Sequence, residues 1–509
     1  MLGVRCAVDS CHHHGENHCT GKRCIIIDIL AKAQLQDLLE LATQKGATYA
    51  DIRSETRYNQ QLSMRNGQVE SLSSTSDAGI GIRVIADGGW GFASTPDLSS
   101  EGMEAAVSRA LTVAHASARQ QLKPVALAPN EAVIATHESY VGKDPFAVPI
   151  TDQITLLQQV HEAMVQVPAV SVTDSRLTLW RNHKIFASTE GAYIDQTITQ
   201  SGGGITATSR GNGDVQRRSY SDYRNAGYEW IEQMSLVERA SKLATEAAQL
   251  LAAPVCPRGP NTLLVGGEMM ALQIHESSGH PVELDRVLGS EDTYAGRSFI
   301  TPEHYHSGNF RYGSDVVNIT GDATIPHGMG SFVYDDEGVP GQRTKLIENG
   351  IFRNYLTSRE TAHELGGLSN GTMRAVGWMN LPLVRMTNIN LEPGDWTLEE
   401  MIRDTQSGVL VDTPKSWSLD DKRVSFHMGN EIAWLIENGA IVGMLKNPSY
   451  TAITPEFWGS CDAVAGRDPS EWNVWGSPGC AKGEPVQVVN VAHGVAPARF
   501  RNVKVGVGE

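Results

Sequence analysis

The chain has 509 residues, a length for which two or three domains are expected rather than one. Its net charge of −16 argues against a general affinity for nucleic acid or for an anionic membrane surface. No apolar run reaches the roughly 18–20 residues that a membrane span needs, so we expect neither a nucleic-acid partner nor a membrane partner.

The cysteines predict a cytoplasmic location. There are seven, an odd number without disulfide-like spacing, and the first apolar run, CIIIDIL, is too short for a signal peptide and contains Asp28. Residues 1–24 are polar and rich in Cys and His, which could form a small metal-binding knuckle. The three consecutive histidines match no zinc-finger spacing and nothing apolar lies nearby, so we interpret residues 1–24 as a disordered extension.

Residues 25–252 are predicted to form an N-terminal domain of helices and antiparallel strands. An amphipathic helix is expected over Ile29–Lys45, ended by Gly46, and a hairpin turn at Asn66-Gly67, because both residues tolerate positive φ. The remaining expected elements are a strand pair over 79–95, a helix over 100–119, a helix opening at 151, strands over 171–220 and one long helix over 228–251.

A domain boundary is predicted at APVCPRGP, residues 253–260, because three prolines and a glycine cannot continue a helix. Residues 261–509 show short strands with glycine turns, which predicts a β-rich C-terminal domain. The fold class is therefore α+β, and fifty glycines agree with much turn and β structure.

Two further patterns lie in this C-terminal part. LIENGIFRNYL (346–356) and LIENGAIVGML (435–445) each predict strand, Asn-Gly turn and strand, and we interpret them as one hairpin formula used twice rather than as a duplication. DDEG (335–338) could form an acidic metal site. We favour a strand-ending turn whose carboxylates accept hydrogen bonds from backbone N–H groups.

The segment QIHESSGHPVEL, residues 273–284, resembles a zinc-protease helix with one residue too many between its histidines. On a regular helix, residues i and i+5 are about 140° apart, so His275 and His280 could not bind one ion. Gly279 permits an unusual turn, Pro281 disfavours helical geometry at His280, and a π-type bulge would align positions i and i+5. We therefore predict a distorted metal-binding helix.

A catalytic zinc usually has three protein ligands, so one more is needed besides His275 and His280. Cys480 is attractive because WGSPGCAKGEP is a glycine- and proline-containing loop, whereas Cys461 lies among aromatic residues and is interpreted as a small buried residue. Spacing alone also leaves these candidates open: Cys256, His427, Glu283 and Asp285.

Beyond this motif, the chain resembles the TldD/PmbA (modulator of DNA gyrase) metalloproteases over about residues 26–508. The resemblance rests on HESSGH together with four longer segments. These are GIGIRVIADGGWGFAST (79–95), MGSFVYDDEGVPGQRTKLIENGIFRNYL (329–356), LPLVRMTN (381–388) and GCAKGEPVQV (479–488).

The resemblance implies that His275, His280 and Cys480 bind Zn²⁺ and that Glu276 is the catalytic base. The chain departs from the family at Ala481, where glycine is usual, without losing a donor atom. The family works as pairs of related subunits and cleaves peptides and unstructured segments. We therefore expect a PmbA/TldE-like partner in a heterodimer, or a homodimer, and a peptide substrate.

The expected function is that of a zinc-dependent metalloprotease in which Glu276 takes a proton from water and passes it to the leaving amine. Two alternatives stay open at this point: a zinc hydrolase of small amides, and a non-catalytic binding subunit. Metal content distinguishes a non-catalytic binding subunit from an enzyme. The shape of the pocket distinguishes a hydrolase of small amides from a protease.

Overall fold

The computed structural model describes residues 30–291 and 296–506, so the extension predicted at 1–24 lies outside the described residues. Within them the chain forms sheets and helices in an α+β arrangement, which confirms the predicted fold class. No helix in these two ranges combines the length and the apolar character that crossing a membrane requires.

The N-terminal half is built on one long sheet, which is antiparallel except where β4 runs parallel to β6. Its strands follow the order β3-β2-β1-β5-β6, and β7 and β4 both pair with β6. Asn66 (φ 50°) and Gly67 (φ 73°) form the predicted turn between the first two strands. The strands are β1 (Tyr49–Arg65), β2 (Gln68–Ala86), β3 (Gly89–Thr95), β4 (Ile134–Glu138), β5 (Val170–Ser188), β6 (Tyr193–Gly211) and β7 (Asp214–Arg224).

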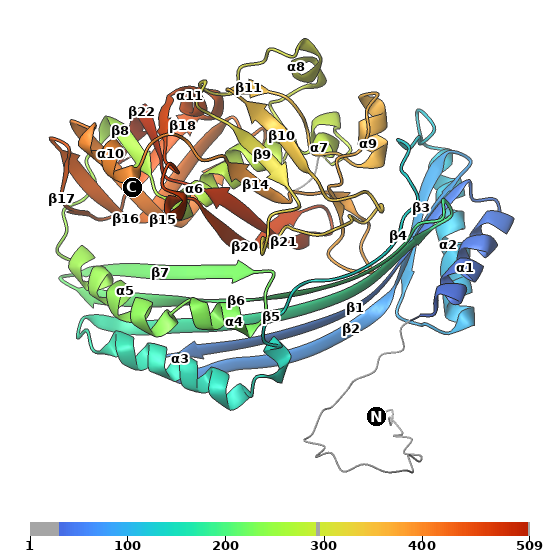
Figure 1. Cartoon of the computed structure of the whole chain (residues 1–509), viewed down its shortest axis with the longest axis horizontal. Helices are drawn as coiled ribbons and strands as arrows, with labels where there is room; N and C mark the ends of the chain where they lie inside the picture. Colours follow the sequence, from blue (N-terminus) through green and yellow to red (C-terminus); the bar gives the residue numbers. More distant parts are fainter. Residues whose placement is uncertain (1–29, 292–295, 507–509) are drawn as a thin grey trace.

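Figure 1 shows this sheet as a curved trough with the C-terminal half on its inner side and helices on its outer side. The helices are α1 (Lys32–Gln44), α2 (Ser100–Ala118), α3 (Ile150–Val165), α4 (Tyr228–Gln233) and α5 (Leu236–Leu250). The prediction of one helix over 228–251 is wrong. Ser235 adopts a left-handed conformation (φ 49°), which ends α4 and lets α5 start in a new direction.

The C-terminal half contains a six-stranded sheet and a seven-stranded sheet. The first has the order β11-β10-β9-β14-β21-β20, and the second has the order β15-β8-β22-β18-β16-β17 with β19 on β22. Both LIENG segments form the predicted hairpins, at Asn349-Gly350 and Asn438-Gly439, but in different sheets.

The strands of the six-stranded sheet are β9 (Ile319–Asp322), β10 (Arg343–Glu348), β11 (Ile351–Phe352), β14 (Asn388–Leu391), β20 (Asn473–Lys482) and β21 (Gln487–Val495). Those of the seven-stranded sheet are β8 (Gly259–Val265), β15 (Ser407–Leu419), β16 (Ser425–Glu437), β17 (Ala440–Leu445), β18 (Ser449–Ile453), β19 (Cys461–Val464) and β22 (Ala498–Val505). The remaining elements are α6 (Gly267–Ile274), α7 (Leu284–Leu288), α8 (Pro302–Ser307), α9 (Arg359–Glu364), β12 (Met373–Arg374), β13 (Leu383–Val384), α10 (Leu398–Arg403) and α11 (Thr454–Gly459).

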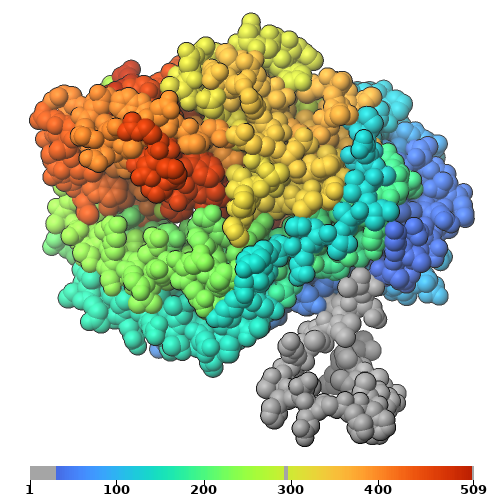
Figure 2. All heavy atoms as spheres, in the orientation of Figure 1, coloured from blue at the N-terminus to red at the C-terminus, as the bar shows by residue number. Residues whose placement is uncertain are grey.

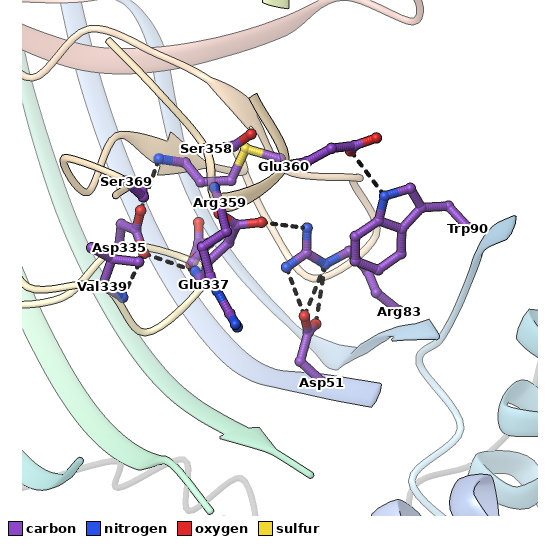
Figure 3. A network of polar contacts seen from close by, with 12 residues as sticks. Asp51, Arg83, Trp90, Asp335, Glu337, Val339, Ser358, Arg359, Glu360 and Ser369 are labelled. Atoms are coloured by element: carbon purple, nitrogen blue, oxygen red, sulfur yellow. Dashed lines mark hydrogen bonds and ion pairs between the residues drawn. The ribbon is translucent and has the colours of Figure 1, made fainter. Parts of the chain in front are cut away.

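The two halves meet along a long seam, seen in Figure 2 between the blue-to-green and the yellow-to-red atoms. DDEG lies in this seam. Asp335 accepts hydrogen bonds from the backbone N–H groups of Glu337 and Val339, both at 2.9 Å, which confirms the predicted turn. Glu337 forms an ion pair with Arg83 of the long sheet (3.3 Å), and Arg83 also pairs with Asp51 (2.6 Å; Figure 3). The turn therefore also joins the halves, which the sequence did not indicate.

Candidate metal centre

The extra residue between the two histidines is accommodated by a π-helical turn. Helix α6 ends at Ile274, and His275–Gly279 continue it as one π-helical segment. The His280 N–H donates to the His275 carbonyl, five residues back, which is the hydrogen bond of a π-helix. This turn aligns positions i and i+5, so the predicted π-type bulge is confirmed.

Two details of that prediction are wrong. His280 is helical (φ −64°, ψ −38°) despite the following Pro281, because the proline sits in the first turn of a short 3₁₀ helix, His280–Val282, where its missing N–H costs nothing. Gly279 has φ −75° and needs no glycine for its conformation. Glycine is needed for space, since a Cβ there would lie 2.1 Å from the Met386 sulfur.

His275, His280 and Cys480 come together although Cys480 lies on β20, about 200 residues later in the sequence. Their ligand atoms lie within 4.8 Å of one another, and the Cys480 Sγ is 3.8 Å from the His280 Nε2. Donor atoms on a tetrahedral zinc are separated by roughly 3.3–3.8 Å, so this group needs only a small contraction to hold the ion. All three side chains are buried.

A hydrogen-bond relay fixes which nitrogen His275 presents. The Nδ1–H of His493 donates to the Ile389 carbonyl at 3.0 Å, so its Nε2 accepts a hydrogen bond from the Nδ1–H of His275 at 2.8 Å. Burial lowers the pKa of both imidazoles. His275 is therefore neutral, and its Nε2 lone pair is free to bind a metal.

His280 is oriented by a carboxylate instead. Its Nδ1 donates to Glu283 at 2.9 Å, which leaves Nε2 facing Cys480. Although burial raises the pKa of Glu283, the charges of Lys482, His280 and Arg286 bring it well below its usual value. Glu283, a candidate ligand by spacing, thus orients the His280 ring instead.

The environment favours the thiolate form of Cys480. Burial raises the pKa of this thiol, but Arg385 and His280 outweigh that effect and lower it below the usual value. Arg385 also donates a hydrogen bond to the Cys480 carbonyl. A buried thiolate and two imidazole nitrogens form the donor set that suits zinc.

Glu276 points into the same region but has a different partner. Its Oε2 accepts a hydrogen bond from the Arg423 Nη1 at 2.5 Å. Burial raises the pKa of Glu276, yet His275, His280 and Arg423 together lower it below the usual value. Glu276 is therefore a carboxylate at neutral pH, as a general base must be.

A cleft of about 630 Å³ opens onto His275, Glu276 and His280. His275, Glu276, His280 and His493 line its floor. Its walls come from the end of β15 and from β20, and the wall residues are Pro414, Trp417, Ser418, Leu419, Trp475, Gly476, Ser477, Pro478 and Gly479. We call it the metal-side cleft.

The other candidate ligands lie elsewhere. Cys461 is buried beside aromatic residues, and its Sγ donates to the Ala463 carbonyl, which confirms its interpretation as a small buried residue. Cys256 and His427 are not part of the group, and Asp285 forms an ion pair with Lys482 at 2.7 Å.

Sequence reasoning missed two residues of the centre, His493 and Arg423. Neither carries a local signal, because each reaches the group from a strand or loop distant in sequence. A single sequence offers no means of selecting them among 16 histidines and many arginines.

Three family models match the described fold in consecutive segments. They are the PmbA/TldA metallopeptidase domain 1 at residues 50–114, the central domain at 143–251 and the C-terminal domain at 259–506. The chain belongs to the PmbA/TldD metallopeptidase family. The C-terminal model covers the His275, His280 and Cys480 group and all residues that line the metal-side cleft except Ser221.

Several PmbA/TldD relatives match almost end to end. A metalloprotease of Methanocaldococcus jannaschii is 29% identical over 88% of this chain and 98% of its own length. A zinc metalloprotease TldD homolog of Saccharolobus solfataricus is 24% identical over 92% of this chain and 98% of its own. These relatives are named metalloproteases, which places the chain in a family of metallopeptidases.

Solved structures share the PmbA/TldD fold. A Thermotoga maritima protein described as a modulator of a DNA gyrase superposes with a TM-score of 0.75 at 18% identity, covering 93% of this chain and 99% of its own. TldE from Thermococcus kodakarensis superposes with a TM-score of 0.70 at 18% identity, covering 93% and 100%. At these identities the likeness establishes the fold alone.

Proposed function

We propose that the chain is a zinc-dependent peptidase that cleaves peptides or unfolded protein segments. The observation that carries the proposal is the convergence of His275, His280 and Cys480 on one point of an open cleft, with the Glu276 carboxylate beside it. The free, buried cysteines among the described residues also support a reducing setting such as the cytoplasm.

In the proposed centre, His275 and His280 bind through Nε2 and Cys480 through Sγ. When bound, zinc supplies a Lewis acid that polarises the scissile carbonyl and lowers the pKa of water toward ~7. Glu276 takes the proton of the attacking water and then gives it to the leaving amine. Arg423 holds the Glu276 carboxylate in place between these two transfers.

Two strand edges on the cleft suit an extended peptide. β20 is the last strand of its sheet, and β15 pairs with β8 only over Gly408–Val411, so Pro414–Leu419 have one unpaired side within the described residues. A peptide added to either edge would be bound mainly through its backbone, and so with little regard to sequence. This mode requires an unfolded substrate.

The two alternatives have less support. A hydrolase of small amides needs a closed pocket, whereas this cleft is about 630 Å³ and lies between two strands. A non-catalytic binding subunit has no need for a complete donor set with a carboxylate beside it. Zinc content together with cleavage of an unfolded peptide tests all three functions.

The ligand assignment predicts a specific pair of results. Cys480→Ser should weaken zinc binding by at least about tenfold, because a serine hydroxyl stays protonated where the thiolate would bind. Cys461→Ser is the matched control, since that cysteine is equally buried but outside the group. Zinc titration against a chromophoric chelator measures both, and equal loss in the two variants would contradict the assignment.

The partner is also a proposal, drawn from the family's paired subunits. We expect the chain to form a 1:1 complex with a PmbA/TldE-like protein and to cleave an unfolded peptide faster in that complex. Mass photometry and peptide cleavage, with and without the added partner, measure both properties. A homodimer with the same activity as the mixture would show that a second copy serves as partner, and full activity of a monomer would rule out pairing.

A further inference from the structure

A second cavity, of about 430 Å³, lies between the long sheet and the C-terminal half. We call it the sheet-side cavity. It adjoins the metal-side cleft at Pro478, which lines both, but none of the proposed zinc ligands and not Glu276 lines it. The sheet-side cavity therefore lies outside the proposed metal centre.

One wall of this cavity is a polar face of the long sheet. Arg57 and Asn59 alternate along β1, and the strand register places Asn182 opposite Arg57 and Trp180 opposite Asn59 on β5. Successive side chains of a strand point to opposite faces, so these four share the face turned away from helices α1 to α5. Burying such a polar face around an open space is costly unless something polar occupies it.

Two arginines on the cavity wall form no ion pair with a carboxylate of the described residues. The Arg57 guanidinium has no hydrogen bond or ion pair within the described residues. It lies close to Gly377, because a Cβ added at that glycine would be 2.9 Å from the Arg57 Nη1. Within residues 30–291 and 296–506, Arg374 donates only to the carbonyls of Met386 (2.8 Å) and Asn490 (2.9 Å). Burial and the nearby Arg385 lower the pKa of Arg374 to about 10.

The acidic groups of the wall are already engaged. Asp336 pairs with Lys184, and Asp335 accepts hydrogen bonds from backbone N–H groups. Asp77 lies across from Arg57 in the strand register and accepts a hydrogen bond from the Trp378 indole at 3.0 Å. An anion entering the cavity would therefore meet two guanidinium groups that form no ion pair in the part of the chain that the structure describes.

The remaining wall chemistry narrows the class of anion. Trp180 and Phe332 offer apolar rings, and the Phe332 ring centroid lies 5.5 Å from the Arg374 guanidinium. Among the described residues, the amide oxygens of Asn59 and Asn182 have no hydrogen-bond partner. A bare inorganic anion would use only the arginines, whereas a peptide end carries a carboxylate, N–H donors and apolar side chains.

We propose that the sheet-side cavity binds the carboxyl-terminal end of a short peptide, with Arg57 and Arg374 as its cationic contacts. The choice of a peptide rests on the proposed peptidase function, whereas the preference for an anion rests on the two arginines. The cavity is then a second peptide site, adjoining the cleft in which cleavage occurs.

The test uses the zinc-loaded Glu276→Gln protein, which should not consume the probe. Isothermal titration calorimetry with N-acetyl-Ala-Ala-Phe is compared with its C-terminal amide, which differs only in lacking the carboxylate. We expect the amide to bind at least about tenfold more weakly, because charge-assisted hydrogen bonds are lost. Adding Arg57→Gln should weaken binding of the free acid by a similar factor.

Arg65→Gln is the matched control, because Arg65 is an exposed residue of the same strand paired with Asp174 at 3.5 Å. Unchanged binding in Arg57→Gln, or equal losses in both variants, would overturn the proposal. Competition by inorganic phosphate as strong as by the peptide would overturn the peptide assignment. Peptide cleavage is measured separately, in the protein that retains Glu276, with and without Arg57→Gln. If peptide binding depends on Arg57 but no peptide is cleaved, only the proposed peptidase function is refuted.

Discussion

Replacing Glu276 with Gln is expected to lower the rate of peptide cleavage by about 10²–10⁴ while zinc stays bound. General base catalysis contributes a factor of this size, and the amide can neither accept the proton of water nor deliver it to the amine. The proposed zinc ligands are untouched, since the Glu276 carboxylate pairs with Arg423. The measurements are kcat on an unfolded peptide and zinc content by plasma mass spectrometry.

Glu268→Gln provides the matched control in the same cleft and on the same helix. Burial and the neighbouring Asp412 and Glu431 raise the pKa of Glu268 well above its usual value, so the amide mimics the form that is already present. Cleavage by Glu268→Gln should stay near that of the parent protein. If Glu276→Gln retained the same turnover as this control, Glu276 would not be the base.

Deleting Ser278 is expected to abolish zinc binding, although it creates the histidine spacing of a regular zinc-protease helix. The deletion removes the π-helical turn that aligns His275 with His280. It also rotates the following chain by about 100°, which moves His280 away from Cys480. The deletion would also disturb the hydrogen bond that the Ser277 Oγ accepts from the Trp458 indole N–H at 2.9 Å.

Ser278→Ala keeps the chain length and is the control for the deletion. It should retain zinc and cleavage, because the backbone that forms the π-helical turn is unchanged. Zinc content, cleavage and thermal unfolding followed by circular dichroism distinguish a lost metal site from a lost fold. A folded deletion variant with full zinc content would mean that the five-residue spacing has no role.

The sequence by itself determined the local features of this protein. The hairpins at Asn66-Gly67, Asn349-Gly350 and Asn438-Gly439 follow from turn chemistry that acts within a few residues. The π-helical turn at His275–Gly279 was predictable for the same reason, since two histidines five residues apart can share an ion only if the helix is distorted. The Asp335 turn also depends on hydrogen bonds to its nearest neighbours.

Local reasoning failed where packing between distant segments decides the structure. Gly279 is required by the Met386 side chain rather than by its own backbone angles, and the break at Ser235 divides a continuous apolar pattern into two helices. The strands on either side of the Asn66-Gly67 turn, β1 and β2, extend over 17 and 19 residues, a length that the turn itself does not predict. Their polar face packs on the C-terminal half, so it does not show the pattern of a buried strand.

Tertiary structure alone decided the outer parts of the centre and the second cavity. His493 and Arg423 reach the zinc-ligand group from segments about 150–220 residues away, and hydrogen bonds between such segments leave no trace in local sequence. The same holds for Arg57 and Arg374, which share a cavity only because the C-terminal half rests on the long sheet. The chemistry of a metal ligand is set by its own side chain, whereas its orientation and charge are set by neighbours that only the folded chain supplies.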